Sequence, residues 1–168
     1  MCSCGLADPT WTTAWDMAFY NIEIVDTLFV EDDAIGSTSF YEAFFNKTFN
    51  TEYVGCNVIA KSDDPDWTWW HQYKSVGREL KCFNPFCVLK KSLIEKVLEF
   101  RKANESFMFH EMLFASLAGS YTDLKKYPDF DLTQFRYRPK VRMVDIKNFN
   151  NVMVHPFKDD KVSMVALM

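Results

Sequence analysis

Three consecutive carboxylates follow a short apolar run, and this is where the sequence first offers residues that could do chemistry. Residues 28–30 (Leu-Phe-Val) favour a buried β-strand covered on both faces, and Glu31, Asp32 and Asp33 come directly after it. Three anions at the rim of a sheet repel one another and lose hydration. Mg²⁺ or Mn²⁺ removes that conflict, because both ions prefer oxygen ligands. We therefore predict a metal-binding motif, with a solvated acidic turn as the alternative.

A second candidate is His110-Glu111, which begins a predicted helix over residues 110–118. We predict that Glu111 is a general base at the edge of a pocket, with its pKa raised by partial burial among Phe107, Phe109 and Phe114. His110 would then lie beside the substrate. The alternative is structural, because the helix macrodipole favours an acidic residue in the first turn of any helix.

The third candidate is His155, which follows the apolar residues 152–154 and precedes Pro156. Proline ends a strand and fixes the direction of the chain on either side. A neutral imidazole there could complete the coordination of a metal held by carboxylates, and Lys158 could pair with a phosphate. A purely structural histidine at the end of a strand remains the alternative.

Tryptophans 67, 69 and 70 lie in the longest irregular stretch, residues 61–78. Indole rings stack on the apolar C–H faces of sugars, so Trp67, Trp69 and Trp70 are candidates for substrate binding. The alternative is a loop that these residues anchor into a small cluster of their own. A basic group at Arg136, Arg138, Lys140 and Arg142 could hold a diphosphate if it faces the site, and is otherwise a solvated strand edge.

Composition limits the class of protein. The chain has 168 residues, 48% of them hydrophobic and 17% aromatic, which is enough for one domain with a real core over residues 1–168. A net charge of −4 without a basic stripe argues against nucleic acid as a partner. No apolar run is long enough to span a membrane, and five cysteines favour a reduced compartment. A cytoplasmic location is favoured, with the secretory pathway and Golgi open if an N-terminal segment is missing.

The elements that must position these residues alternate between helix and strand. We expect helices over residues 11–24, 39–46, 92–102 and 110–118, and strands over 27–30, 53–60, 86–89 and 135–138. Residues 1–10 are expected to be disordered and 161–168 to form a tail. This alternation predicts a single α/β domain of layered helices and strands, with 53–60 as a central strand.

The candidates occur in an order that resembles the nucleotide-sugar-dependent glycosyltransferases of the GT-A fold. The motifs that carry the resemblance are Glu31-Asp32-Asp33, Trp67-Thr68-Trp69-Trp70-His71, His110-Glu111 and His155-Pro156-Phe157-Lys158. The resemblance implies a mixed sheet flanked by helices, and Mn²⁺ or Mg²⁺ bridging the two phosphates of a nucleotide-sugar donor. It also implies a carbohydrate or glycoconjugate acceptor.

Residue by residue, the resemblance implies that Asp33 is the principal metal ligand, with Asp32 or Glu31 assisting at the metal or the ribose. Glu111 would be the base of an inverting transfer. His155 would be a further metal or diphosphate ligand, and Lys158 a phosphate contact.

The resemblance is incomplete at the N-terminus. Only about 30 residues precede the acidic motif, where the family has a nucleotide-binding βα half. We therefore expect a truncated domain with an exposed sheet edge, which predicts either poor solubility or a partner chain that covers the edge. Two other functions stay open: a non-catalytic carbohydrate-binding or interaction fragment, and a metal-dependent phosphoester hydrolase.

Overall fold

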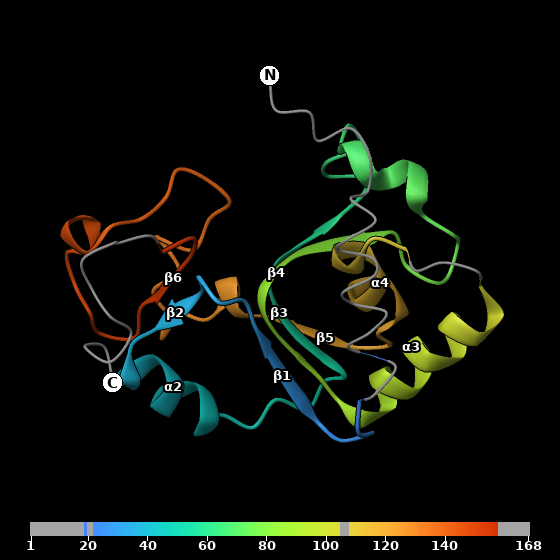
Figure 1. Cartoon of the computed structure of the whole chain (residues 1–168), viewed down its shortest axis with the longest axis horizontal. Helices are drawn as coiled ribbons and strands as arrows, with labels where there is room; N and C mark the ends of the chain where they lie inside the picture. Colours follow the sequence, from blue (N-terminus) through green and yellow to red (C-terminus); the bar gives the residue numbers. More distant parts are fainter. Residues whose placement is uncertain (1–18, 20–21, 105–107, 158–168) are drawn as a thin grey trace.

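The computed structural model describes residue 19 and residues 22–104 and 108–157, which form a mixed α/β fold (Figure 1). Its strands are β1 (Thr27–Val30), β2 (Ile35–Gly36), β3 (Tyr53–Ala60), β4 (Leu80–Leu89), β5 (Tyr121–Asp123) and β6 (Met153–Val154). Its α-helices are α2 (Thr38–Phe45), α3 (Lys91–Ala103) and α4 (His110–Leu117). Three short 3₁₀-helices are η1 (Thr68–Gln72), η2 (Leu124–Lys126) and η3 (Met143–Asp145).

The main sheet has the strand order β1-β4-β3-β5. The pairs β1/β4 and β3/β4 are antiparallel, and β3/β5 is parallel, so the sheet is mixed. A separate two-stranded ribbon pairs β2 with β6 in antiparallel fashion. The prediction of a mixed sheet flanked by helices is therefore confirmed, and residues 53–60 form a central strand as expected.

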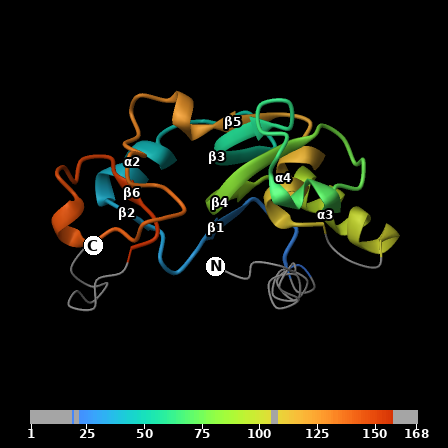
Figure 2. The same cartoon turned by 90° about the horizontal axis from the view of Figure 1, so that it is seen from above.

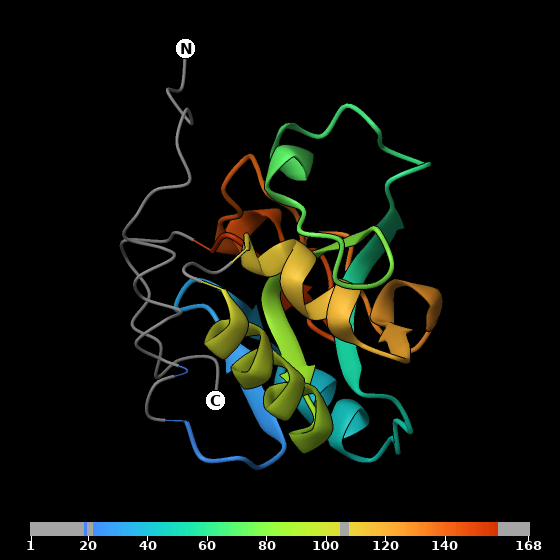
Figure 3. The same cartoon turned by 90° about the vertical axis from the view of Figure 1, so that its right-hand side faces the viewer.

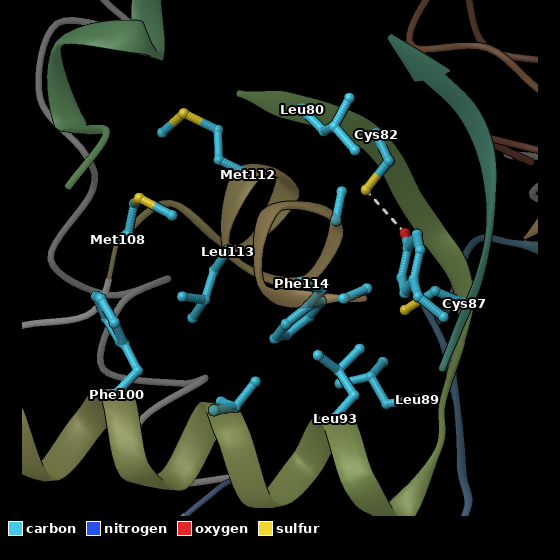
Figure 4. Close-up of a cluster of buried hydrophobic side chains, with 14 of the residues drawn as sticks. Leu80, Cys82, Cys87, Leu89, Leu93, Phe100, Met108, Met112, Leu113 and Phe114 are labelled. Atoms are coloured by element: carbon cyan, nitrogen blue, oxygen red, sulfur yellow. Dashed lines mark hydrogen bonds between the residues drawn. The ribbon is translucent and has the colours of Figure 1, made fainter. Parts of the chain in front are cut away.

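Helices cover both faces of the main sheet. Figure 2 shows α3 and α4 on one side and α2 on the other, and Figure 3 shows α3 and α4 in front of the strands. The alternation of side chains along β3 serves both layers, because Tyr53 joins the core beneath α3 and α4 while Val54 joins the core beneath α2. Figure 4 shows the first of these cores.

Local sequence explains the helices. In α2, the Ser37 side chain caps the helix by accepting from the Phe40 N–H at 3.2 Å, and Phe40 and Phe44 lie on the buried face. In α3, Leu93, Ile94 and Val97 are fully buried at helical spacing. Burial of such side chains contributes roughly 1.5–3 kcal/mol each.

Strand β4 is longer than expected. The sequence predicts a strand over 86–89, but β4 runs continuously from Leu80 to Leu89 and includes Pro85, a residue type that is uncommon inside strands. The carbonyl of Pro85 accepts the Glu31 N–H at 2.8 Å and so continues the pairing of β1 with β4. The pairing of β3 with β4 shifts register on both sides of Cys56, and no local sequence pattern predicts this irregularity.

Two strand predictions are wrong. Residues 28–30 were expected in a strand buried on both faces, but β1 is an edge strand in which Val30 is 40% exposed. Residues 135–138 form no strand, and only an isolated bridge joins Phe135 to His155.

Several predictions concern residues outside the described ranges, namely 1–10, 161–168 and most of the helix over 11–24. In its described part, residues 22–24 are not helical, whereas Phe19 is. None of the helices in the described ranges has the length and apolar character needed to cross a membrane.

Candidate metal and acid–base site

Glu31, Asp33 and His155 meet where the main sheet joins the β2–β6 ribbon. Each offers a ligand atom, and these atoms all lie within 4.8 Å of one another. His155 Nε2 is 3.2 Å from Glu31 Oε2 and 3.2 Å from Asp33 Oδ1. The structure thus brings together residues from two motifs far apart in the sequence.

Backbone hydrogen bonds hold the two acidic residues in place. Glu31 follows β1, and its N–H is bound by Pro85 of β4. Asp33 precedes β2, and its carbonyl accepts the Phe157 N–H at 2.8 Å. One carboxylate is therefore tied to the main sheet and the other to the ribbon segment that carries His155.

The His155 ring is oriented by its surroundings and is only 6% exposed. Its Nδ1–H donates a hydrogen bond to the Arg136 carbonyl at 2.9 Å, which leaves Nε2 directed at the carboxylates. The rings of Phe83 and Phe135 pack against it at 5.1 and 5.8 Å between centroids. Burial lowers the pKa of His155, but hydrogen bonds to Glu31 and Arg136 and the charge of Asp33 outweigh it and raise the pKa overall.

The residue between the two acidic ligand candidates is not part of their group. Asp32 is exposed and lies outside the group formed by Glu31, Asp33 and His155. The predicted phosphate contact, Lys158, lies outside the described residues. Of the proposed metal ligands, three of four are thus gathered at one point.

Glu111 lies in the first turn of α4, within electrostatic reach of this group. Burial is the main reason that its pKa is raised to about 8, and the negative charge of Glu31 adds to the effect. The positive charges of Lys81 and His155 act in the opposite direction. A carboxyl group with a pKa near neutrality is suited to accepting a proton and then releasing it.

The neighbouring His110 packs into an aromatic environment. Its ring lies 4.8 Å from that of Phe109 and 6.4 Å from that of Phe114. Burial lowers the pKa of His110 to about 3, so the ring is neutral at physiological pH. A role in substrate binding remains a prediction for this residue.

The tryptophan segment is anchored to the protein. Trp70 is buried, and its indole N–H donates to the Asp64 carbonyl at 2.7 Å. Trp69 stacks on Phe109 at 5.0 Å between centroids, and Trp67 lies 5.8 Å from the same ring. The anchored-loop alternative therefore describes the packing, and the segment lies against the residue that precedes α4. Sugar stacking on the half-buried Trp67 and Trp69 stays a prediction.

Two residues near Glu111 were not singled out in the sequence. Lys81, on β4, forms an ion pair with Asp64, and its Nζ lies 4.5 Å from the centroid of the Trp67 ring. Asn84, also on β4, is buried, and its Nδ2 donates to the His110 carbonyl at 3.2 Å. Polar residues alternating with Leu80 and Cys82 could have signalled a strand that begins before Pro85.

The basic residues lie on a loop beside His155. The Arg136 N–H donates to the His155 carbonyl at 3.1 Å, and the Val141 N–H donates to the Pro156 carbonyl at 2.8 Å. Both ends of the loop are thereby fixed to the segment that follows β6. Arg142 is paired with Asp145 at 3.3 Å.

A pocket of about 660 Å³ lies away from this site. Val152 and Val154 line it, and their side chains alternate along the chain with Met153 and His155. The pocket therefore faces the side of the ribbon opposite to the metal-ligand candidates, and none of Glu31, Asp33, Glu111 and His155 lines it.

Fold and site together define a mixed α/β protein with a carboxylate–histidine group beside a partly buried carboxylic acid. Comparison with known protein families, with curated proteins and with solved structures found no match.

Proposed function

We propose that this chain binds Mn²⁺ or Mg²⁺ through Glu31, Asp33 and His155, and transfers a sugar from a nucleotide-diphosphate donor to an acceptor hydroxyl. The observation that carries the proposal is the convergence of the three ligand atoms within 4.8 Å. The order of the motifs and the mixed sheet flanked by helices support a GT-A-like arrangement.

The three side chains suit such a cation. Two carboxylate oxygens and one imidazole nitrogen form a mostly hard donor set, which matches Mn²⁺ and Mg²⁺ better than a thiolate-preferring metal. The Nε2 atom of His155 faces both carboxylates because its Nδ1 is engaged by Arg136.

Glu111 is the proposed base. The ionised form of Glu111 is the one that can act. As the acceptor oxygen bonds to the anomeric carbon, the hydroxyl proton passes to this carboxylate and the bond between that carbon and the donor diphosphate breaks. A bound divalent cation would neutralise the charge that builds up on the departing diphosphate. Attack from the face opposite the leaving group gives inversion, which needs no covalent nucleophile on the protein.

Calorimetric titration with Mn²⁺, alone and with UDP or GDP, tests the proposal. Wild-type protein should bind Mn²⁺ and nucleotide together, and Asp33→Ala should abolish this binding. Asp32→Ala is the matched control, since Asp32 is an exposed neighbour outside the ligand group.

Each result of this titration has a clear consequence. Binding of Mn²⁺ without either nucleotide would argue for a different metal-dependent activity, such as phosphoester hydrolysis. Absence of Mn²⁺ binding in the wild type would overturn the proposal. The contacts of His155 with Glu31 and Asp33 would then be structural ion pairs.

A further inference from the structure

We propose that Asn84 is a positioning residue, which together with Tyr53 and Cys82 fixes the first turn of α4 on β4 and so places Glu111 relative to Glu31. The inference rests on the proposed role of Glu111 as a base. It concerns residues that lie beneath the site and make no contact with the three metal-ligand candidates among the described hydrogen bonds.

Three polar side chains form a buried network at this point. The hydroxyl of Tyr53 donates to Asn84 Oδ1 and also lies 2.8 Å from Cys82 Sγ. Tyr53, Cys82 and Asn84 are 0%, 3% and 2% exposed, so water does not compete for these bonds. Cys82 lies between β4 and α4 in Figure 4, where a dashed line marks its hydrogen bond.

The network ends on the backbone of His110, a substrate-binding candidate, and of Glu111, the base candidate. Asn84 Nδ2 donates to the His110 carbonyl at 3.2 Å. The Cys82 thiol lies within hydrogen-bonding distance of two acceptors, the Glu111 carbonyl at 3.2 Å and Asn84 Oδ1 at 2.8 Å, which share its one proton. Burial raises the pKa of the Cys82 thiol well above its usual value, so the sulfur keeps the proton that it donates. Two consecutive carbonyls of the first turn of α4 are thus bound by side chains of β4, which sets the rotation of that turn.

The next residue of β4 holds Glu31, the metal-ligand candidate, in place. Pro85 follows Asn84 directly, and its carbonyl accepts the backbone N–H of Glu31. Adjacent residues of β4 therefore bind the helix that carries Glu111 and the backbone of Glu31, which directly follows β1. The separation of the base candidate and the metal-ligand candidate is set at this single point of β4.

Stability alone does not require such a network. Replacing buried hydrogen-bonded groups by apolar groups of the same shape is often neutral for folding. A network whose members are all satisfied instead imposes one geometry, because any displacement leaves a buried polar group without its partner. A fixed base is what proton transfer from a bound acceptor needs.

The test follows the titration of the Glu111 carboxyl carbon by NMR in metal-free protein, with the resonance assigned by its absence in Glu111→Gln. In Asn84→Leu the first turn of α4 loosens and water reaches Glu111, so the pKa should fall toward its ordinary value by about one pH unit or more. Tyr53→Phe removes only the hydroxyl, and we expect a smaller shift in the same direction. If Asn84→Leu does not fold, the Glu111 titration in Tyr53→Phe tests the inference.

Ser116→Ala is the matched control. Ser116 is a buried polar residue of the same helix, and its hydroxyl donates to the Leu80 carbonyl of β4 at 3.0 Å, away from the first turn. It should leave the titration of Glu111 unchanged. Equal titrations in wild type and in the folded Asn84 and Tyr53 variants would overturn the inference, as would an equal shift in Ser116→Ala.

Titration of the same samples with Mn²⁺ separates this inference from the proposed function. We expect the Asn84 and Tyr53 variants to bind Mn²⁺ with the wild-type affinity, within about twofold. Failure of the wild type to bind Mn²⁺ would overturn the proposed function alone. Wild-type Mn²⁺ affinity together with an unchanged Glu111 pKa in the Asn84 and Tyr53 variants would overturn the positioning role alone.

Discussion

His155 Nε2 lies 3.2 Å from Glu31 Oε2, although Glu31 extends the main sheet and His155 extends the β2–β6 ribbon. This contact joins two β-structures that share no strand. Asp33, between β1 and β2, approaches the same nitrogen at 3.2 Å. The contact therefore defines the place where a cation would link the two parts of the fold.

Removing the imidazole should weaken metal binding. His155→Ala deletes one of three candidate ligands, so the affinity for Mn²⁺ should fall by at least about tenfold. Calorimetry measures the change, and His71→Ala is the control because that histidine is exposed and lies outside the ligand group. Equal affinities in the two variants would mean that His155 is no ligand.

The raised pKa of Glu111 predicts how stability depends on pH. The folded-state pKa, about 8, lies above the ordinary value, so between about pH 4.5 and 8 the folded protein holds a proton that the unfolded chain releases. The free energy of unfolding of metal-free protein should therefore fall as pH rises through this range, by up to about 1.4 kcal/mol per pH unit. Urea denaturation at several pH values measures it. Glu111→Gln should flatten the slope, and an unchanged slope would contradict the prediction.

Lys81 should lower the pKa of Glu111 without itself binding the metal. Its positive charge lowers the pKa of Glu111, so Lys81→Met should raise that pKa further above its ordinary value. Carboxyl NMR titration detects the change. Lys61→Met is a suitable control, because Lys61 also lies near a tryptophan and pairs with Glu79. A shift of the same size in both variants would show a non-specific effect of net charge.

The pair of Glu52 and Lys96 should stabilise the fold above acidic pH. Burial raises the pKa of Glu52, but hydrogen bonds from Lys96 at 2.7 Å and from the Gly119 N–H at 2.6 Å lower it overall. A lowered folded-state pKa stabilises the protein above the unfolded-state pKa, and this contribution disappears as pH falls through the folded-state value.

Glu52→Gln should accordingly cost about 1 kcal/mol at neutral pH, a modest figure because both side chains are partly exposed. Thermal or urea unfolding at neutral and acidic pH would measure the difference between variant and wild type, which should narrow on acidification. If the difference in unfolding free energy between variant and wild type does not change with pH, the ion pair of Glu52 and Lys96 makes no ionic contribution to stability.

The sequence by itself determined the elements that depend on local patterns. Helices expected over 39–46, 92–102 and 110–118 occur within one residue of those bounds, because apolar side chains at helical spacing are a local feature. The strands 27–30 and 53–60 were likewise found from their apolar, β-prone runs. The types of the candidate site residues were also visible without a structure.

Only the tertiary structure decided how these elements meet. The edge position of β1, the inclusion of Pro85 in β4 and the anchored tryptophan segment all depend on pairing between distant segments. The contact of Glu31 and Asp33 with His155, and the exclusion of Asp32, depend on which side of the chain faces the ribbon. Long-range strand register fixes these facts, and it comes from the packing of the whole core, which no short stretch of sequence contains.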